Sequence, residues 1–158
     1  GVNQLGRLSK TPGLAYEQAS VAPNSTLPVQ EIGYNYRVSF DIDGTKEAMG
    51  TELFRSQDAV FYLSDPISGM LGFARDGYLN TFTYNVQPGQ RMNIAIEGDN
   101  KATRLFINGK QVEELNIQER WMDKEGKSRM RNVRTLVFPL EKAGNFKSQI
   151  TNLKVEQK

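Results

Sequence analysis

Two acidic residues, Asp41 and Asp43, alternate with apolar residues and are the sequence's best candidates for catalytic chemistry. In a β-strand such residues share one face with their Cα atoms about 6.5–7 Å apart, a spacing that suits the carboxylate pair of a glycoside hydrolase. A third acid, Glu47, follows, but Gly44 is expected to end the strand before it. The sequence therefore favours solvated acids at a strand end, and a carboxylate-based glycosidase is the alternative.

The same pair, Asp41 and Asp43, is also a candidate calcium site, because Ca²⁺ prefers several oxygen ligands from carboxylates and loop carbonyls. The other ligand positions of a calcium-binding helix-loop-helix are missing, so surface acids are again the favoured interpretation. The chain contains no histidine and no cysteine. Their absence excludes Ser-His-Asp and Cys-His catalysis, the usual zinc sites and any disulfide.

Four residues are candidates for sugar binding, which pairs a flat aromatic ring with charged or amide groups: Arg75, Asp76, Tyr78 and Trp121. The first three are also typical of a hairpin turn, and the sequence favours the turn. Trp121 lies in a charged segment, where a surface contact and a lid over the core are equal alternatives. An exposed aromatic ring rimmed by charge suits docking onto a catalytic domain as well as it suits a sugar.

The composition is that of one soluble domain: 158 residues, 38% hydrophobic and 24% charged. Residues 1–12 are expected to be a lead-in or linker, and residues 13–158 a single domain. A net charge of +2 argues against a nucleic-acid partner, and the basic residues near position 125 are interleaved with acidic ones. No apolar run approaches the roughly 18 residues that cross a membrane, so no membrane span is expected.

The alternation of apolar and polar residues over positions 34–43 predicts a strand with one buried face. The aromatic residues on its apolar side are Tyr34, Tyr36 and Phe40, and they are expected in the core. This is the clearest element in the sequence, because the period of two continues without a break until the turn that Asp43 and Gly44 predict.

Further short strands are expected at residues 50–55, 59–63, 70–75, 79–85, 91–97, 103–107, 111–115, 133–140 and 149–156. Asn108 and Gly109 predict a type I′ hairpin between two of them, because both residues tolerate positive φ. Residues 119–131 are highly charged and predict a long loop or a short helical turn. Many short strands without interleaved helices predict an all-β fold, an antiparallel β-sandwich of the jelly-roll kind.

Two segments resemble the concanavalin A-like, laminin G-like superfamily, which implies the same sandwich. The first runs from Arg91 to Lys110 and contains the turn Asn-Gly-Lys after a strand. The second covers residues 144–155, which resemble the closing strand of these domains. Arg91 stands where tryptophan is common in the superfamily, and Ser148 and Thr151 stand where glycine and aspartate are typical.

Residues 52–63 and 68–78 resemble a narrower family, the C-terminal domains of bacterial family 20 β-N-acetylhexosaminidases. The resemblance implies a non-catalytic accessory domain behind a catalytic barrel of the same chain, amino-sugar glycans as possible ligands, and an exported, periplasmic or surface location. No catalytic residue and no cofactor is expected in the domain itself, calcium apart. The alternatives are an independent carbohydrate-binding module and a β-sandwich glycosidase that uses Asp41 and Asp43.

Overall fold

The computed structural model describes residues 12–57, 59–75, 77–116, 118–122, 124–126, 128–132 and 140–158, with the backbone alone in 118–122 and 128–132. These residues form the strands β1 (Gly13–Val21), β2 (Tyr36–Asp43), β3 (Thr51–Arg55), β4 (Ala59–Ser64), β5 (Gly72–Arg75), β6 (Tyr78–Thr81), β7 (Arg91–Gly98), β8 (Ala102–Ile107), β9 (Lys110–Asn116), β10 (Gln118–Met122), β11 (Ser128–Asn132) and β12 (Gln149–Gln157). In the described ranges no helix is long and apolar enough to cross a membrane.

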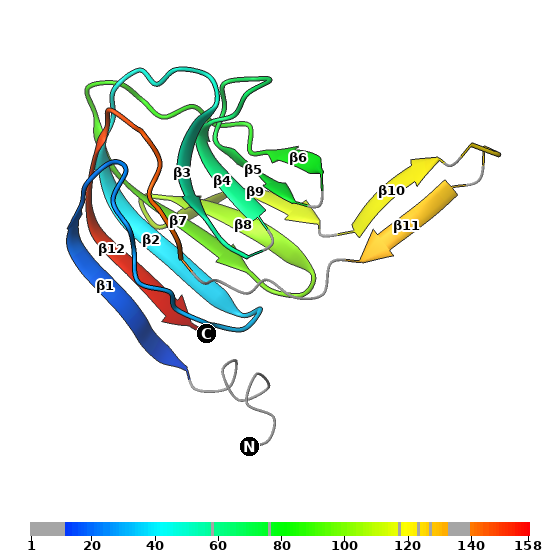
Figure 1. Cartoon of the computed structure of the whole chain (residues 1–158), viewed down its shortest axis with the longest axis horizontal. Helices are drawn as coiled ribbons and strands as arrows, with labels where there is room; N and C mark the ends of the chain where they lie inside the picture. The colour runs from blue at the N-terminus through cyan, green and yellow to red at the C-terminus, as the bar shows by residue number, and fades with distance from the viewer. Residues whose placement is uncertain are drawn as a thin grey trace.

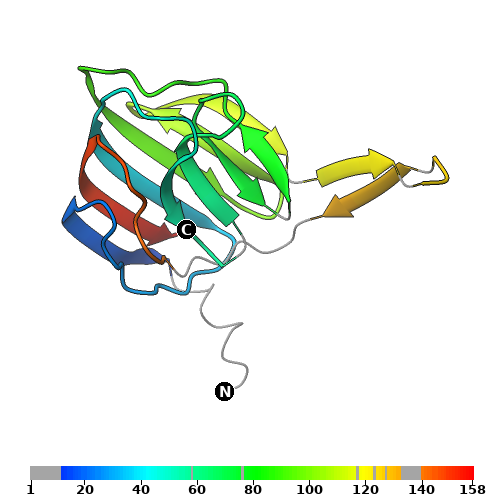
Figure 2. The same ribbon diagram turned by 45° about the horizontal axis from the view of Figure 1, so that its top comes forward.

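Two antiparallel sheets pack face to face, which confirms the predicted β-sandwich. One has six strands in the order β1-β12-β2-β7-β8-β9, and the other has four in the order β3-β4-β5-β6. Figure 1 shows the smaller sheet lying across the larger one, and Figure 2 shows the same two layers after a turn of 45°. The crossovers between sheets bring the first and last strands of the fold together, since β1 pairs with β12.

Strand β2 behaves as its alternating sequence predicts. Tyr36, Phe40 and their apolar neighbours on the same face have no exposed surface, whereas Asp41 and Asp43 face outward and are half-buried. The prediction of a core position is wrong for Tyr34, which is 38% exposed. The strand starts at Tyr36, so the alternation before it does not lie on the sheet.

Four phenylalanine rings form a continuous row between the two sheets. The ring of Phe61 on β4 lies 5.2 Å from Phe54 on β3 and 5.5 Å from Phe73 on β5, between centroids. Phe82, just after β6, is 5.8 Å from Phe73. All four are at most 3% exposed and the rings are tilted against each other, a geometry that adds to the energy of burial.

The hairpin between β8 and β9 has the turn that its sequence predicts. Asn108 and Gly109 have φ values of 51° and 84°, as a type I′ turn requires. The Asn108 side-chain oxygen also accepts a hydrogen bond of 2.9 Å from the backbone N–H of Asn93 on β7. The turn is therefore tied to the next strand of the sheet.

The prediction of a loop or helical turn over residues 119–131 is wrong, because β10 and β11 form an antiparallel hairpin there. Gly126 has φ of 79°, which allows the chain to reverse between them. Figure 2 shows this hairpin extending away from the sandwich. Residues 118–132 show no apolar period of two, so the sequence did not indicate strands there. The strand predicted at 133–140 falls, except for Leu140, outside the described residues.

Two irregular segments, 24–27 and 140–144, lengthen the four-stranded sheet beyond β3. Glu141 and Gly144 donate backbone hydrogen bonds to the carbonyls of Arg55 and Leu53, at 3.2 and 3.1 Å. On the other side the 24–27 segment pairs with 140–144 through a bridge between Thr26 and Lys142. The two segments therefore widen the face of the four-stranded sheet beyond β3.

Candidate functional site

The candidate carboxylate pair lies on the outer face of the six-stranded sheet. Arg91 on β7 bridges the two acids, 2.8 Å from Asp43 and 3.5 Å from Asp41. Hydrogen bonds from the side-chain amides of Asn152 and Asn93, at 2.8 and 3.1 Å, lower the pKa of Asp41, and Arg91 adds to that effect. Among the described residues, no group of three or more acids, histidines or cysteines has the geometry of a metal site.

The four predicted sugar-binding residues are divided between two parts of the fold. Arg75 ends β5 and is directly opposite Tyr78, the first residue of β6. Arg75 is only 3% exposed, and its guanidinium lies over the Phe73 ring at 4.8 Å, whereas Tyr78 is 38% exposed. Asp76 and the side chain of Trp121 lie outside the described residues. The backbone of Trp121 is part of the separate hairpin, on β10.

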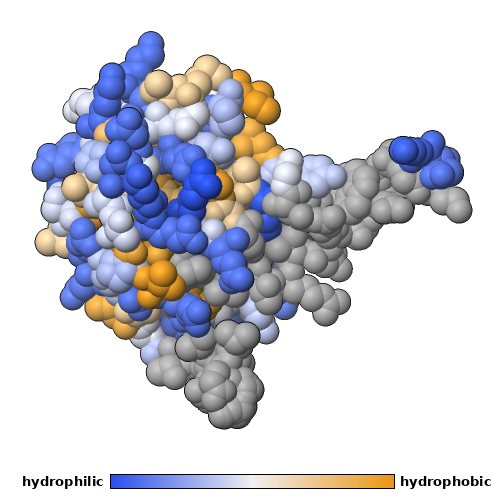
Figure 3. Space-filling model, viewed as in Figure 1, coloured by the Kyte–Doolittle hydropathy of each residue, from blue (hydrophilic) through white to orange (hydrophobic). Residues whose placement is uncertain are grey.

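A hollow lies elsewhere, on the outer face of the widened four-stranded sheet, and none of the predicted site residues lines it. This sheet-face groove has a volume of 660 Å³. Its lining residues are Asn24, Ala48, Met49, Gly50, Thr51, Glu52, Arg55, Lys142, Ala143, Gly144 and Asn145. Figure 3 shows hydrophilic side chains gathered on this face. The groove is therefore a polar surface, open to solvent.

A carboxylate–guanidinium pair, Glu52 and Arg55, forms the polar centre of the sheet-face groove. Arg55 Nε donates to Glu52 Oε1 at 2.9 Å and Nη2 donates to Oε2 at 2.8 Å. This bidentate hydrogen bond lowers the pKa of Glu52 and raises the pKa of Arg55. Both groups therefore stay charged across the physiological range, with side chains 30% and 50% exposed.

A β-bulge explains why both side chains face the groove. Residues three apart in a regular strand point to opposite faces. In β3, however, Glu52 is opposite Tyr62 and Phe54 is opposite Phe61, so Leu53 is an extra residue in the strand. The bulge shifts the alternation of side-chain directions by one residue, so that Glu52 and Arg55 point to the same side of the sheet.

The far wall of the sheet-face groove requires glycine at position 144. A Cβ atom on Gly144 would lie 2.1 Å from the backbone oxygen of Glu52, too close for any side chain. Without a side chain, Gly144 hydrogen-bonds to the carbonyl of Leu53 and accepts a bond of 2.9 Å from the N–H of Asn24. The segment therefore packs directly on β3, and its polar neighbours are held beside Glu52.

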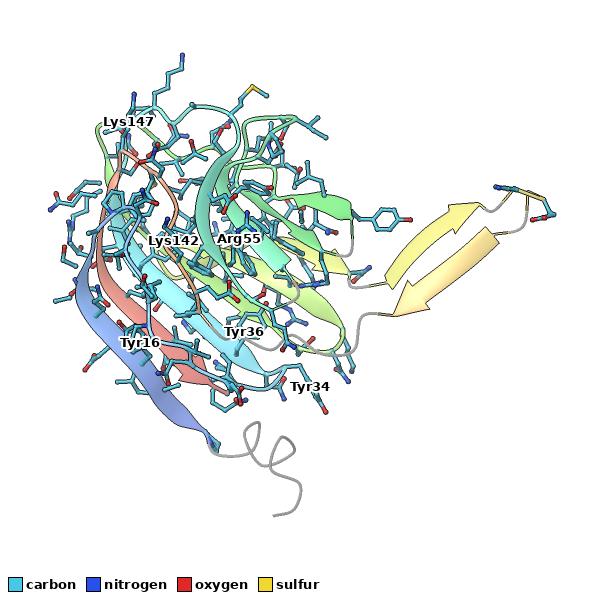
Figure 4. The ribbon with its side chains drawn as sticks, viewed as in Figure 1. Tyr16, Tyr34, Tyr36, Arg55, Lys142 and Lys147 are labelled. Carbon is cyan, nitrogen blue, oxygen red and sulfur yellow. The ribbon has the colours of Figure 1, made fainter. Side chains whose placement is uncertain are left out.

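Three further polar side chains, those of Asn24, Lys142 and Asn145, are exposed around the sheet-face groove. Within the described ranges, none of them has a side-chain hydrogen bond or ion pair. Figure 4 shows Lys142 and Arg55 on the face turned toward the viewer. Two amides and an ammonium group are therefore available to a ligand beside the Glu52–Arg55 pair.

An aromatic residue, Tyr62, flanks the sheet-face groove from β4. It is directly opposite Glu52 across the β3–β4 pair, and directly opposite residues of an antiparallel pair share a face. Both Tyr62 and Glu141 interact electrostatically with Arg55 and raise its pKa, after Glu52 itself. The half-buried Tyr62 therefore places a ring beside the charged pair.

Sequence reasoning missed this site for an identifiable reason. The residues of the sheet-face groove come from positions 24, 48–55 and 142–145. No local motif joins them, and no residue of the 52–55 run signals the bulge. The available clue is Gly144 next to two amide-bearing or basic residues, Lys142 and Asn145, in a segment without strand alternation.

Comparisons with known proteins show the fold. Domain 4 of AbnA, an extracellular GH43 arabinanase from Geobacillus stearothermophilus solved in complex with arabinotriose, superposes with a TM-score of 0.59 and 18% identity, over 92% of this chain and 75% of that one. The galectin LEC-6 of Caenorhabditis elegans superposes with a TM-score of 0.56 and 13% identity, over 88% and 94%. No family model matches the sequence, and no curated protein matches it. The chain therefore shares the fold of these proteins, a two-sheet antiparallel β-sandwich.

Proposed function

We propose that the domain is a carbohydrate-binding module and that the sheet-face groove holds the glycan. The observation that carries the proposal is the Glu52–Arg55 pair, solvent-open and fixed by two hydrogen bonds, with the amides of Asn24 and Asn145 beside it. No sequence motif contributes to this assignment. It rests on the chemistry that the groove offers.

Sugar hydroxyls both donate and accept hydrogen bonds, and neighbouring hydroxyls on a ring present this pattern in pairs. A carboxylate accepts from such a pair while the adjacent guanidinium and amide N–H groups donate to it. Because Glu52 and Arg55 are already locked together, little side-chain entropy is lost when a sugar binds. The ring of Tyr62 supplies an apolar surface beside them.

The charges around the sheet-face groove favour an uncharged sugar. Two cations, Arg55 and Lys142, are matched by two carboxylates, Glu52 and Glu141, on the same strand and on the segment beside it. A balanced set attracts no particular ion, so binding is expected to depend little on salt. The arabinanase domain of similar fold was solved with a neutral trisaccharide, which supports a saccharide ligand.

The proposal extends to the parent protein. The resemblance of residues 52–63 and 68–78 to hexosaminidase C-terminal domains supports an accessory role behind a catalytic domain that acts on amino sugars, in an exported bacterial protein. The gene upstream of this segment tests the point. A catalytic barrel with an export signal is expected there, and an unrelated neighbour would contradict it.

We also propose that the domain has no glycosidase activity of its own. A glycosidase acid needs a raised pKa to hold its proton, but Asn152, Asn93 and Arg91 lower the pKa of Asp41. Asp43 is half-exposed and paired with the same Arg91. Hydrolysis of aryl glycosides by the purified domain, lost in Asp43→Asn, would contradict this part of the proposal.

A glycan titration followed by backbone amide NMR shifts tests the binding proposal. The panel contains neutral arabino-oligosaccharides, N-acetylglucosamine and N-acetylgalactosamine oligomers, and a uronic acid oligomer. We expect localised shifts in residues 50–55 and 142–145 with at least one neutral glycan. Absence of shifts at millimolar ligand, or shifts confined to Tyr78 or to the outer face of the six-stranded sheet, would contradict the assigned groove.

Two arginine variants make a matched pair for the same experiment. Arg55 and Arg91 are 50% and 52% exposed, and each lies 2.8 Å from its carboxylate partner, but they occupy opposite sheets. Arg55→Ala is expected to weaken glycan binding by at least about tenfold, the equivalent of one charge-assisted hydrogen bond. Arg91→Ala is expected to leave binding unchanged. Equal effects of the two variants would refute the role of Arg55.

A further inference from the structure

A second hollow lies at the rim of the sandwich and meets the sheet-face groove at one side chain. This rim pocket has a volume of 340 Å³. It is lined by Thr45, Lys46, Glu47, Met49, Leu63, Ser64, Ser68, Gly69, Asn85, Val86 and Pro88. Met49 is the residue that lines both hollows, and it is 59% exposed. The two hollows are therefore neighbours that share one apolar, unbranched side chain, which has several rotatable bonds.

We propose that the sheet-face groove and the rim pocket are consecutive subsites for one oligosaccharide, and that Met49 at their junction sets the preference for chain length. The inference rests on the proposed glycan binding and adds to it the class of ligand, a chain of at least two sugar units. Each hollow is within the ~300–1,000 Å³ range of small-molecule sites, so each has room for a sugar ring.

The two subsites differ in chemistry. The sheet-face groove presents charged and amide groups, whereas Leu63, Val86 and Pro88 join Met49 in making the rim pocket largely apolar. A sugar ring has C–H faces, and an acetamido group carries a methyl, both of which suit such a pocket. Met49 lies over Gly69, since a Cβ there would be 3.6 Å from Met49 Cγ. The Met49 side chain thus contacts the rim pocket at Gly69 and also lines the sheet-face groove.

The walls of the rim pocket are fixed before any ligand arrives. The Glu47 carboxylate accepts backbone hydrogen bonds from Lys147 and Ser148 at 3.0 and 2.7 Å, which ties the 44–50 loop to the segment before β12. On the opposite wall, Asp65 accepts the N–H of Ile67 at 2.8 Å and also the side chain of Ser68. A preformed wall lowers the ordering cost of binding, so the second subsite adds affinity.

Calorimetric titration of a length series tests the inference, with arabinose and N-acetylglucosamine as monosaccharide probes and their di-, tri- and tetra-oligomers as chains. For the unaltered domain we expect affinity to rise by about tenfold or more from one to three units, and amide shifts to spread from residues 50–55 to residues 67–69 and 85–86. In Met49→Trp the larger ring fills the junction, so the ratio of trisaccharide to monosaccharide affinity is expected to fall toward one.

The control variant is Val112→Trp on β9, at a position that is 46% exposed and lines neither hollow. It is expected to keep the length dependence of the unaltered domain, and thermal melting checks that both variants fold. Equal affinity for one and three sugar units, or a length dependence that Met49→Trp leaves intact, would overturn the proposal of consecutive subsites. In that case, glycan-dependent shifts in the sheet-face groove would still support the proposed function. Absence of any glycan-dependent shift in the groove would overturn both.

Discussion

Replacing Gly144 by alanine tests the construction of the sheet-face groove most directly. The added methyl would lie 2.1 Å from the Glu52 carbonyl oxygen and 2.6 Å from its carbonyl carbon, where ordinary contact begins at 3.4 Å. The obstruction is backbone, so no side-chain rotation relieves it. The 140–144 segment must move away from β3 by well over an ångström, and the groove must widen with it.

The expected cost follows from what that movement breaks. The hydrogen bonds of Gly144 to Leu53 and from Asn24 to Gly144 are lost or stretched, at about 1 kcal/mol each. Strain from overpacking adds roughly 1–3 kcal/mol. Gly144→Ala is therefore expected to destabilise the domain by about 3–5 kcal/mol and to weaken glycan binding, because Lys142 and Asn145 move away from Glu52.

Urea denaturation followed by fluorescence measures the stability, and the NMR titration measures binding. Gly89→Ala is the control, because Gly89 has φ of 78° and open space around its Cβ position, so that only the backbone penalty of about 1–2 kcal/mol applies. A Gly144→Ala variant no less stable than Gly89→Ala, or one that bound glycan as tightly as the unaltered domain, would refute the idea that this glycine sets the groove wall.

Three further predictions concern the buried Asp65, the aromatic row and the Glu52 carboxylate. Asp65 is fully buried, and burial raises its pKa, but hydrogen bonds from Ser68, Ile67 and Thr81 outweigh burial and lower the pKa. The ionised Asp65 therefore stabilises the fold above pH 3.8, and this stabilisation is lost as the pH falls through the lower pKa of the folded state. Asp65→Asn should cost about 2–3 kcal/mol at pH 7 and flatten the acid limb of a stability–pH curve. Phe73→Ala should cost about 3–5 kcal/mol by urea denaturation, with Tyr78→Ala as a near-neutral comparison. Because the hydrogen bond from its arginine partner lowers the pKa of Glu52, glycan affinity measured by calorimetry should hold from neutral pH until the pH falls below the ordinary carboxyl value of 4.5, and an earlier loss would contradict the role of this carboxylate.

The regular part of the fold could be predicted because burial imposes a period on the sequence. In β2 every second side chain is buried in the core and is apolar, and the register with β7 places the buried residues of the two strands opposite each other. The Asn108–Gly109 turn was equally visible, since few residue pairs accept two positive φ values in succession. The segment 118–132 carries neither signal in its sequence, and its strands β10 and β11 were not predicted.

The site could not be predicted in the same way, because its walls are joined by backbone hydrogen bonds and not by patterned side chains. The contacts of Gly144 with Leu53 and Asn24 link positions far apart in the chain. Backbone groups are the same in every residue, so a sequence does not identify which segment they will pair with. In the sequence, the only sign of this packing is Gly144, a glycine that does not lie in a turn.

Two arginines show how much depends on one residue of register. Arg75 lies two positions after Phe73 in a regular strand, so it must share the inner face with that buried ring, and it is 3% exposed. Arg55 follows the buried Phe54 by one position and therefore faces outward, and the extra residue at Leu53 leaves Glu52, three positions before Arg55, on the outside as well. In a regular strand Glu52 and Arg55, three positions apart, would point to opposite faces, and the carboxylate would be separated from the guanidinium. The chemistry of the groove therefore depends on an irregularity of the sheet, and the same amino-acid types in a regular strand would not produce it.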